Sequence, residues 1–180
     1  MSFTNVSLEQ IRARVTKTLA HGIQLNMSTD ESKKFLKRHV NRKTNVMIMI
    51  IDVNNSTEMS LTLQEDRFAL LIQTFAQEIS IAVTGYGGYV FKYEGDAVIA
   101  LFPGEYDELK ACNNALNSAT SILQIIREVV NPTFKKNVGT PGNTSLTDAA
   151  IAPISAPIFT VFAISRSRVS GRTTFLNTFF

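Results

Sequence analysis

The stretch GGYVFKYEGDAVIALF, residues 87–102, determines the fold expected for this chain. Its two halves, Tyr89 to Lys92 and Ala97 to Phe102, are rich in aromatic and β-branched residues, which favours strands. Glu94-Gly95-Asp96 lies between them, and Pro103-Gly104 follows. The pattern predicts an antiparallel hairpin whose tip carries the acidic residue Asp96.

The elements around this hairpin complete a β-α-β-β-α order. Asn45 to Val53 is a continuous apolar run ending in an acid, as in a buried strand. A long amphipathic helix follows. A second helix is expected from about Glu105 to Val130, with Pro132 after its end and Asn137-Val138 beginning the next strand. We therefore predict an α+β fold with a ferredoxin-like β-α-β-β-α core, an antiparallel sheet and helices on one face. The last strands are left uncertain, with Ile158 to Ile164 as a candidate.

Composition divides the chain into three zones. Residues 1–44 are polar and charged, with apolar residues at helical spacing, and are predicted to form a helical lead-in or linker. Residues 45–139 form the predicted domain. Residues 140–180 lack Lys and Glu and contain three prolines, so we expect a divergent, poorly ordered tail.

Composition also limits the partners and the compartment. The dense basic run from Lys33 to Lys43 is interpreted as a solvated helix face rather than a nucleic-acid surface. No apolar run reaches the roughly 18 residues of a membrane span, and Met1 to Gln10 lacks the pattern of a signal peptide. Cys112 is the one cysteine, which suits a reducing compartment. We expect a cytoplasmic chain with no membrane span and no nucleic-acid partner.

Two aspartates mark the candidate site. Asp52 ends the first strand, and Asp96 lies at the tip of a hairpin expected beside that strand. Carboxylates this close repel each other unless a cation lies between them. Mg²⁺ or Mn²⁺, which prefer oxygen ligands, are the natural candidates. The alternative is a purely structural role, in which such strand aspartates cap a turn or pair with a lysine.

The turn after Asp52 is a candidate phosphate site, because it opens a helix whose first N–H groups have no intrahelical partner. Its residues are Val53, Asn54, Asn55, Ser56 and Thr57. Gly95, next to Asp96, allows a ligand or backbone to approach closely.

The strand Met49 to Val53 with Ser56-Thr57, and the hairpin 87–102, resemble the class III adenylate/guanylate cyclase catalytic domain. The resemblance covers about Asn45 to Gly139. It implies that Asp52 and Asp96 are catalytic and bind two Mg²⁺ or Mn²⁺ ions, with Val53 as a further metal contact. It also implies that Lys92 selects the base, since adenylate cyclases carry Lys there and guanylate cyclases Glu.

The resemblance implies conversion of ATP to 3′,5′-cyclic AMP and pyrophosphate in intracellular signalling, by a head-to-tail homodimer or a heterodimer with another cyclase chain. The family also needs an Asn followed four residues later by an Arg that stabilises the transition state. Beyond Gly139, Arg166, Arg168 and Arg172 have no such Asn. The alternative is therefore a catalytically incomplete module that binds nucleotide or dimerises.

Two other classes fit less well. A diguanylate cyclase would need a Gly-Gly-acid-Glu-Phe hairpin, where this chain has Tyr93 to Ala97 reading YEGDA. A ferredoxin-like RNA binder would need basic residues around the strand aromatics, and Lys92 alone is basic there.

Overall fold

The computed structural model describes residues 7–22, 27–41, 44–54, 56–138, 158–164 and 178–179. The helices are α1 (Leu8–His21), α2 (Asp30–Arg38), α3 (Ser56–Thr62), α4 (Glu65–Gly85), α5 (Glu108–Ile125), a π-helical turn (Ile126–Val130) and α6 (Asn131–Val138). The strands are β1 (Val46–Asp52), β2 (Tyr89–Glu94), β3 (Ala97–Pro103), β4 (Ile158–Ile164) and β5 (Thr178–Phe179).

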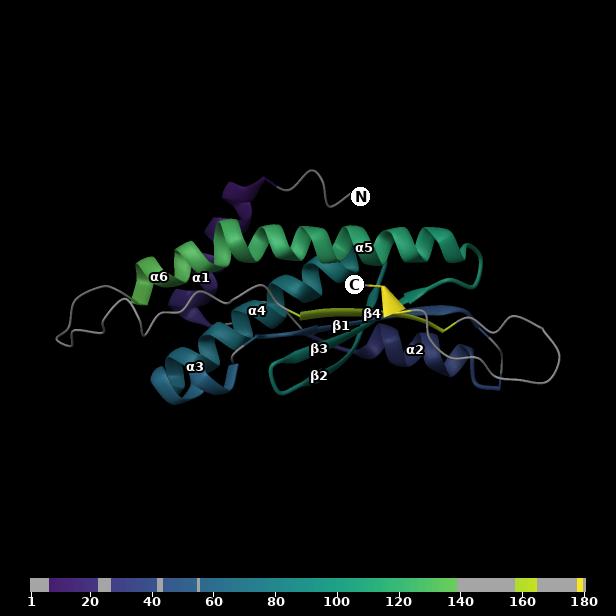
Figure 1. Ribbon diagram of the computed structural model, residues 1–180, viewed down its shortest axis with the longest axis horizontal. Helices are drawn as coiled ribbons and strands as arrows, with labels where there is room; N and C mark the ends of the chain where they lie inside the picture. The colour runs from purple at the N-terminus through teal and green to yellow at the C-terminus, as the bar shows by residue number, and fades with distance from the viewer. Residues whose placement is uncertain are drawn as a thin grey trace.

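The strands form one antiparallel sheet in the order β2-β3-β1-β4-β5. β1 is central and pairs with β3 on one side and β4 on the other. This is the predicted ferredoxin-like arrangement, with helices α4 and α5 of the β-α-β-β-α core on one face (Figure 1). The strand position left uncertain is filled by β4, the candidate segment in the tail. The rest of residues 140–180, apart from β5, lies outside the described residues.

Alternation along β1 separates the two faces of the sheet. Met47, Met49 and Ile51 are buried and belong to the main core, together with the apolar sides of α4 and α5. Ile48 and Ile50 point the other way and are only half-buried. We call this second side the open face, and it bears on function because it also carries residues of the candidate site.

The long helix α4 follows the predicted apolar spacing. On length and composition alone it could cross a membrane, but half of its most apolar window is buried inside the fold. It packs against α5 and β2. Gly88, just beyond its end, lets β2 pass close to the helix, since a Cβ there would lie 2.7 Å from Phe102 Cε1 and 2.8 Å from Val83 Cγ1. α4 is therefore a core helix of this fold.

The prediction was wrong about where the second helix ends. The helical run does not stop before Pro132, and Asn137-Val138 does not begin a strand, because both lie within α6. Pro132 is tolerated because it is the second residue of α6, in the first turn, where a missing N–H costs little. Phe134 is 5% exposed and anchors this extension in the core.

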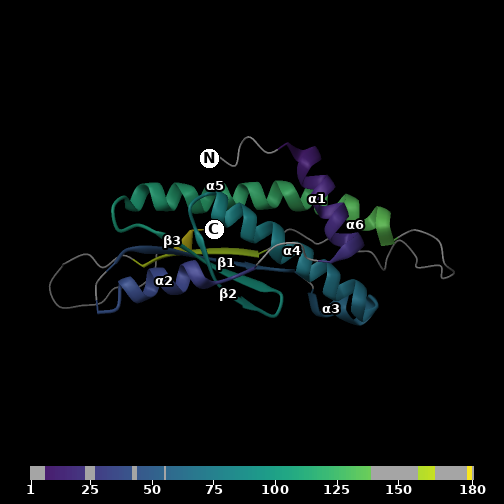
Figure 2. The same ribbon diagram turned by 180° about the vertical axis from the view of Figure 1, so that it is seen from behind.

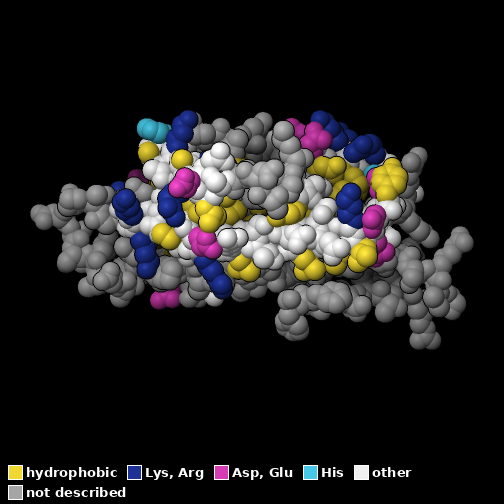
Figure 3. Space-filling view, turned by 90° about the horizontal axis from the view of Figure 1, so that it is seen from above, with side chains coloured by type: hydrophobic (Ala, Val, Ile, Leu, Met, Phe, Trp, Pro, Cys, Tyr) yellow, Lys and Arg dark blue, Asp and Glu magenta, His cyan; other side chains and the backbone are white. Residues whose placement is uncertain are grey.

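The exposed side of α5 is poor in charged residues, with none between Lys110 and Arg127. In Figure 3 the charged side chains gather toward the two ends of the molecule.

Both helices predicted in the lead-in exist, and they pack on opposite sides of the sheet. α1 begins at a capping box formed by Ser7 and Gln10 and buries Ile11 and Val15 in the main core. α2 lies on the other side of the sheet from α5 (Figures 1 and 2). The part of the basic run that lies in α2 is exposed, and Lys33 and Lys34 form i,i+3 pairs with Asp30 and Glu31. Arg42 and Lys43 lie outside the described residues.

Candidate functional site

Asp52 and Asp96 come from neighbouring parts of the sheet. Asp52 is the last residue of the central strand β1. Asp96 lies in the tight turn between β2 and β3, where Glu94 pairs with Ala97 across the hairpin. Gly95 has φ +62°, which glycine adopts readily at the first central position of such a turn. Ile51 pairs with Val98 of β3, so the end of β1 lies next to this turn.

The two carboxyls meet. Burial raises the pKa of Asp52, and the charge of Asp96 raises it further. The Val53 N–H, which donates to Asp52 Oδ1 at 3.0 Å, acts in the opposite direction, and a side-chain hydrogen bond with Asp96 again favours the protonated form. Two carboxyls this close repel each other when both are ionised, and a cation bound between them removes that repulsion.

The donor set fits a hard divalent cation. No ion pair among the described residues includes Asp52 or Asp96, so no lysine or arginine in that part of the chain neutralises the two carboxyls. The described part of the chain has no cluster of three or more His, Cys, Asp or Glu side chains suited to a metal. One or two carboxylates are the usual protein ligands of Mg²⁺, and water and substrate phosphates supply the other oxygen ligands.

The predicted phosphate turn is partly defined. Val53 is 3% exposed, its side chain belongs to the main core, and its N–H is engaged by Asp52. Asn54 forms a turn, and α3 begins at Ser56, followed by Thr57. Asn55 lies outside the described residues. The turn thus leads from the carboxyl pair directly into a helix, as the sequence predicted.

Lys92 lies on the open face, like Asp52. β2 has an irregularity between Val90 and Lys92, so Phe91 is an extra residue in its pairing with β3. As a result, Val90 faces the main core, whereas Lys92 pairs with Ile99 on the open side. β1 and β2 are separated by β3, so Lys92 lies about 10 Å from β1 at the usual strand spacing.

Sequence reasoning missed the partner of Lys92. Its Nζ lies 3.0 Å from Glu94 Oε1 in an exposed ion pair. The signal was available, because residues two apart on a strand share a face. The hairpin is also tied to α4 on its inner side, where Tyr93 Oη and Ser80 Oγ are 2.7 Å apart.

The remaining residues that the resemblance requires are not placed. Arg166, Arg168 and Arg172 lie outside the described residues. β4 enters the sheet beside the site, since Ile158 pairs with Asp52. The strand predicted as a candidate in the tail thus reaches the carboxyl pair.

The fold is similar to that of a solved nucleotide cyclase. The crystal structure of the adenylyl cyclase CyaB from P. aeruginosa matches with a TM-score of 0.52 and 16% identity, over 67% of this chain and 55% of that chain. The described part of the chain thus has a class III cyclase-like fold. No family model matches it.

Two further relatives of the class III cyclase-like domain were found. A bacterial light-regulated adenylyl cyclase matches with a TM-score of 0.48 and 13% identity, over 74% of this chain and 39% of that one. A uridylate cyclase from Burkholderia cepacia is 29% identical over 83 residues, 46% of this chain and 36% of the relative. The chain thus spans only about a third of the length of the uridylate cyclase and about half that of CyaB.

Proposed function

We propose that this domain is a nucleotide cyclase that converts ATP to 3′,5′-cyclic AMP and pyrophosphate. The observation that carries the proposal is the contact between the carboxyls of Asp52 and Asp96 at the end of the central strand. In a cyclase-like fold, a pair of carboxyls with no basic partner among the described residues is best explained as a divalent-cation site.

The residues divide the chemistry between them. Asp52 and Asp96 would hold the ions, and the Val53 N–H keeps the Asp52 carboxylate oriented. When bound, two divalent ions lower the pKa of the ribose 3′-hydroxyl and offset the charge that develops on the phosphates. The 3′-oxygen would lose its proton to water and form a bond to the α-phosphorus, while the bond from that phosphorus to the pyrophosphate oxygen would break and pyrophosphate would leave. N–H groups at the start of α3 would receive a phosphate.

Lys92 supports ATP as the substrate. Its ammonium can donate to the N1 acceptor of adenine, while the adjacent Glu94 carboxylate can accept from the N6 amino group. UTP is the second candidate, because the curated relative is a uridylate cyclase. Uracil also presents an acceptor beside a donor, so the choice between the two needs direct measurement.

The domain would act as a head-to-tail dimer in the cytoplasm, where its triphosphate substrate is abundant. A partner copy, or another cyclase chain, would then supply the base-recognition and transition-state groups opposite Asp52 and Asp96. If neither supplies them, the chain is a nucleotide-binding or dimerisation module without turnover, since loss of a transition-state arginine can cost several orders of magnitude in rate.

The test is incubation of the purified chain with each of ATP, UTP, GTP and CTP in the presence of Mn²⁺, with mass-spectrometric detection of the cyclic product. We expect cyclic AMP, and we expect it to vanish in both Asp52→Asn and Asp96→Asn. Asp66→Asn is the matched control, because it removes an exposed carboxylate from the first turn of α4.

Thermal unfolding with and without Mn²⁺ separates the alternatives. Stabilisation by Mn²⁺ and nucleotide without product supports the non-catalytic module. Cyclic UMP in place of cyclic AMP supports the second substrate. If the parent chain forms no cyclic product and is not stabilised by Mn²⁺, a metal-dependent nucleotide site at this pair is refuted.

A further inference from the structure

A histidine fastens α2 to the sheet. His39 caps the C-terminus of α2, with Nδ1 2.7 Å from the Phe35 carbonyl oxygen and Nε2 2.5 Å from Glu105 Oε2. The Phe35 carbonyl and the ionised Glu105 carboxylate can each accept a hydrogen bond but cannot donate one. A neutral imidazole has a single N–H and can satisfy only one of them. With Glu105 ionised, the geometry therefore favours the doubly protonated, cationic ring.

The segment that this ring holds covers part of the open face. Phe35 is 1% exposed, and its ring lies 4.3 Å from His39 and 5.7 Å from Tyr89 of β2, centroid to centroid. Tyr89 pairs with Leu101, which is 6% exposed although it points away from the main core. Phe35 and Leu101 are both absent from the main core cluster. α2 thus closes a small apolar cluster of its own on the open face.

The groups around His39 favour its charged form. The Phe35 carbonyl raises the pKa of His39, the hydrogen bond and charge of Glu105 raise it further, and burial and Arg38 act in the opposite direction. From β2, the ionisable neighbour in the same cluster is Tyr89, through Phe35. The cation also lies at a helix C-terminus, where positive charge is favoured.

We propose that His39 is a protonation-dependent latch that holds α2 against the open face of the sheet. Its stabilising effect is complete below the unfolded-state pKa of about 6.5 and is lost as pH rises through the higher folded-state value. Deprotonation leaves Glu105 or the Phe35 carbonyl without its donor, and α2 loosens. The same face carries Asp52 and Lys92, so release of α2 uncovers more of this face, around Tyr89 and Leu101 at the end of the sheet away from Asp52.

The first measurement is a pH titration of the histidine ring signals by NMR. The chain has only two histidines, so His21→Gln leaves a single titrating ring and assigns it. We expect His39 to titrate above about 6.5 and Glu105→Gln to lower its pKa. Glu65→Gln, at the exposed start of α4, is the matched control and should leave the His39 titration unchanged.

The second measurement is hydrogen exchange of α2 amides across the same pH range, corrected for intrinsic exchange rates, with α5 as internal reference. We expect α2 protection to fall about tenfold as His39 loses its proton while α5 protection holds. In His39→Gln, α2 should be weakly protected at every pH. Protection of α2 that stays constant through the His39 titration, or a His39 pKa below about 6.5, would overturn the latch.

Discussion

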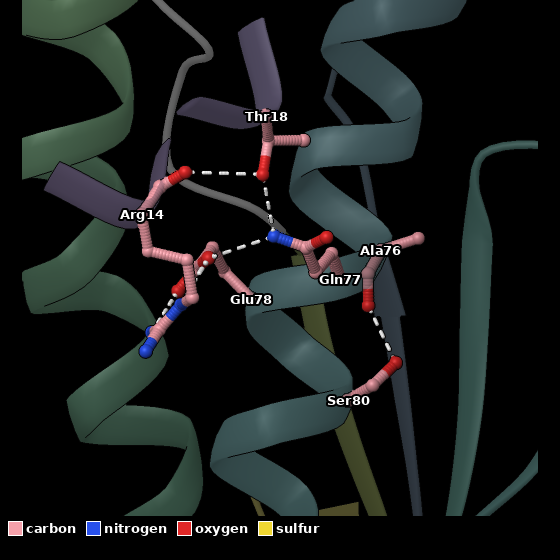
Figure 4. Close-up of polar contacts among 6 residues, drawn as sticks. All are labelled: Arg14, Thr18, Ala76, Gln77, Glu78 and Ser80. Carbon is pink, nitrogen blue, oxygen red and sulfur yellow. Dashed lines mark hydrogen bonds and ion pairs between the residues drawn. The ribbon is translucent and has the colours of Figure 1, made fainter. Parts of the chain in front are cut away.

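The contact between α1 and α4 yields a quantitative prediction. Arg14 of α1 binds Glu78 of α4 through two hydrogen bonds, with Nε 2.9 Å from Oε1 and Nη2 bonded to Oε2 (Figure 4). The Glu78 side chain is 3% exposed and that of Arg14 is 27% exposed. Arg14→Met keeps much of the apolar stem and removes the guanidinium. It therefore leaves a buried carboxylate without its cation.

The cost follows from burial. Breaking a buried ion pair on one side typically costs about 3–5 kcal/mol, because the remaining charge is desolvated and unpaired. Arg14 is partly open to water, so we expect the low end, about 3 kcal/mol. Gln77 Nε2 donates a long hydrogen bond to Glu78 Oε1 at 3.4 Å, and its neutral amide cannot replace the lost positive charge. For a chain of this size, the loss corresponds to a fall of roughly 6–12 °C in melting temperature.

The assay is thermal and urea unfolding at neutral pH, with Arg12→Met as the control. Arg12 is on the same helix, and its Nη2 donates to the Glu128 carbonyl oxygen at 3.3 Å, so the same substitution should cost about 1 kcal/mol or less. The double variant Arg14→Met/Glu78→Met should recover most of the loss, since replacing a buried pair by apolar residues is often neutral. If Arg14→Met costs no more than Arg12→Met, the reasoning from burial is refuted.

Three further predictions concern the site and its hairpin. Asp52→Asn should raise the melting temperature at pH 7 in EDTA, because the raised pKa of Asp52 means that its ionised form opposes folding. The gain in melting temperature should disappear below the unfolded-state pKa of about 3.9. A lower melting temperature of Asp52→Asn at pH 7 would contradict this prediction. Gly88→Ala should cost about 1–3 kcal/mol in urea unfolding, because its Cβ would overlap Phe102 and Val83. Gly95→Ala meets no atom within 4 Å, so its cost should be only the roughly 1 kcal/mol of a left-handed backbone, and a larger loss would indicate an unseen contact.

Periodicity was sufficient to predict most of the fold. The spacing of three and four in α4 placed the correct residues in the core, because a single face of that helix is buried. The continuous apolar run of β1 predicted a buried strand but did not indicate which of its side chains face the core. The hairpin was predicted because strand-like runs flank Glu94-Gly95-Asp96, and the structure closes it with the two-residue turn Gly95-Asp96. From these elements the meeting of Asp52 and Asp96 followed by topology alone.

What could not be predicted depends on tertiary context. Pro132 usually ends a helix, but here a π-helical turn precedes it and α6 restarts with the proline in its first turn. The contact of His39 with Glu105 joins residues far apart in the sequence, and no local sequence pattern predicts it. Arg14 and Glu78 likewise belong to segments that composition assigned to different zones.

The single extra residue in β2 determines which side chains face outward. In a strand without this irregularity, Val90 and Lys92 would share a face, so regular pairing of Phe91 would turn Lys92 toward the main core and the Tyr93 hydroxyl away from Ser80. The extra residue thus lets Val90 and Tyr93 face the core while Lys92 and Glu94 face outward from the same short strand. The face on which the Lys92 ammonium lies therefore depends on the number of residues in the strand, and composition alone does not determine it.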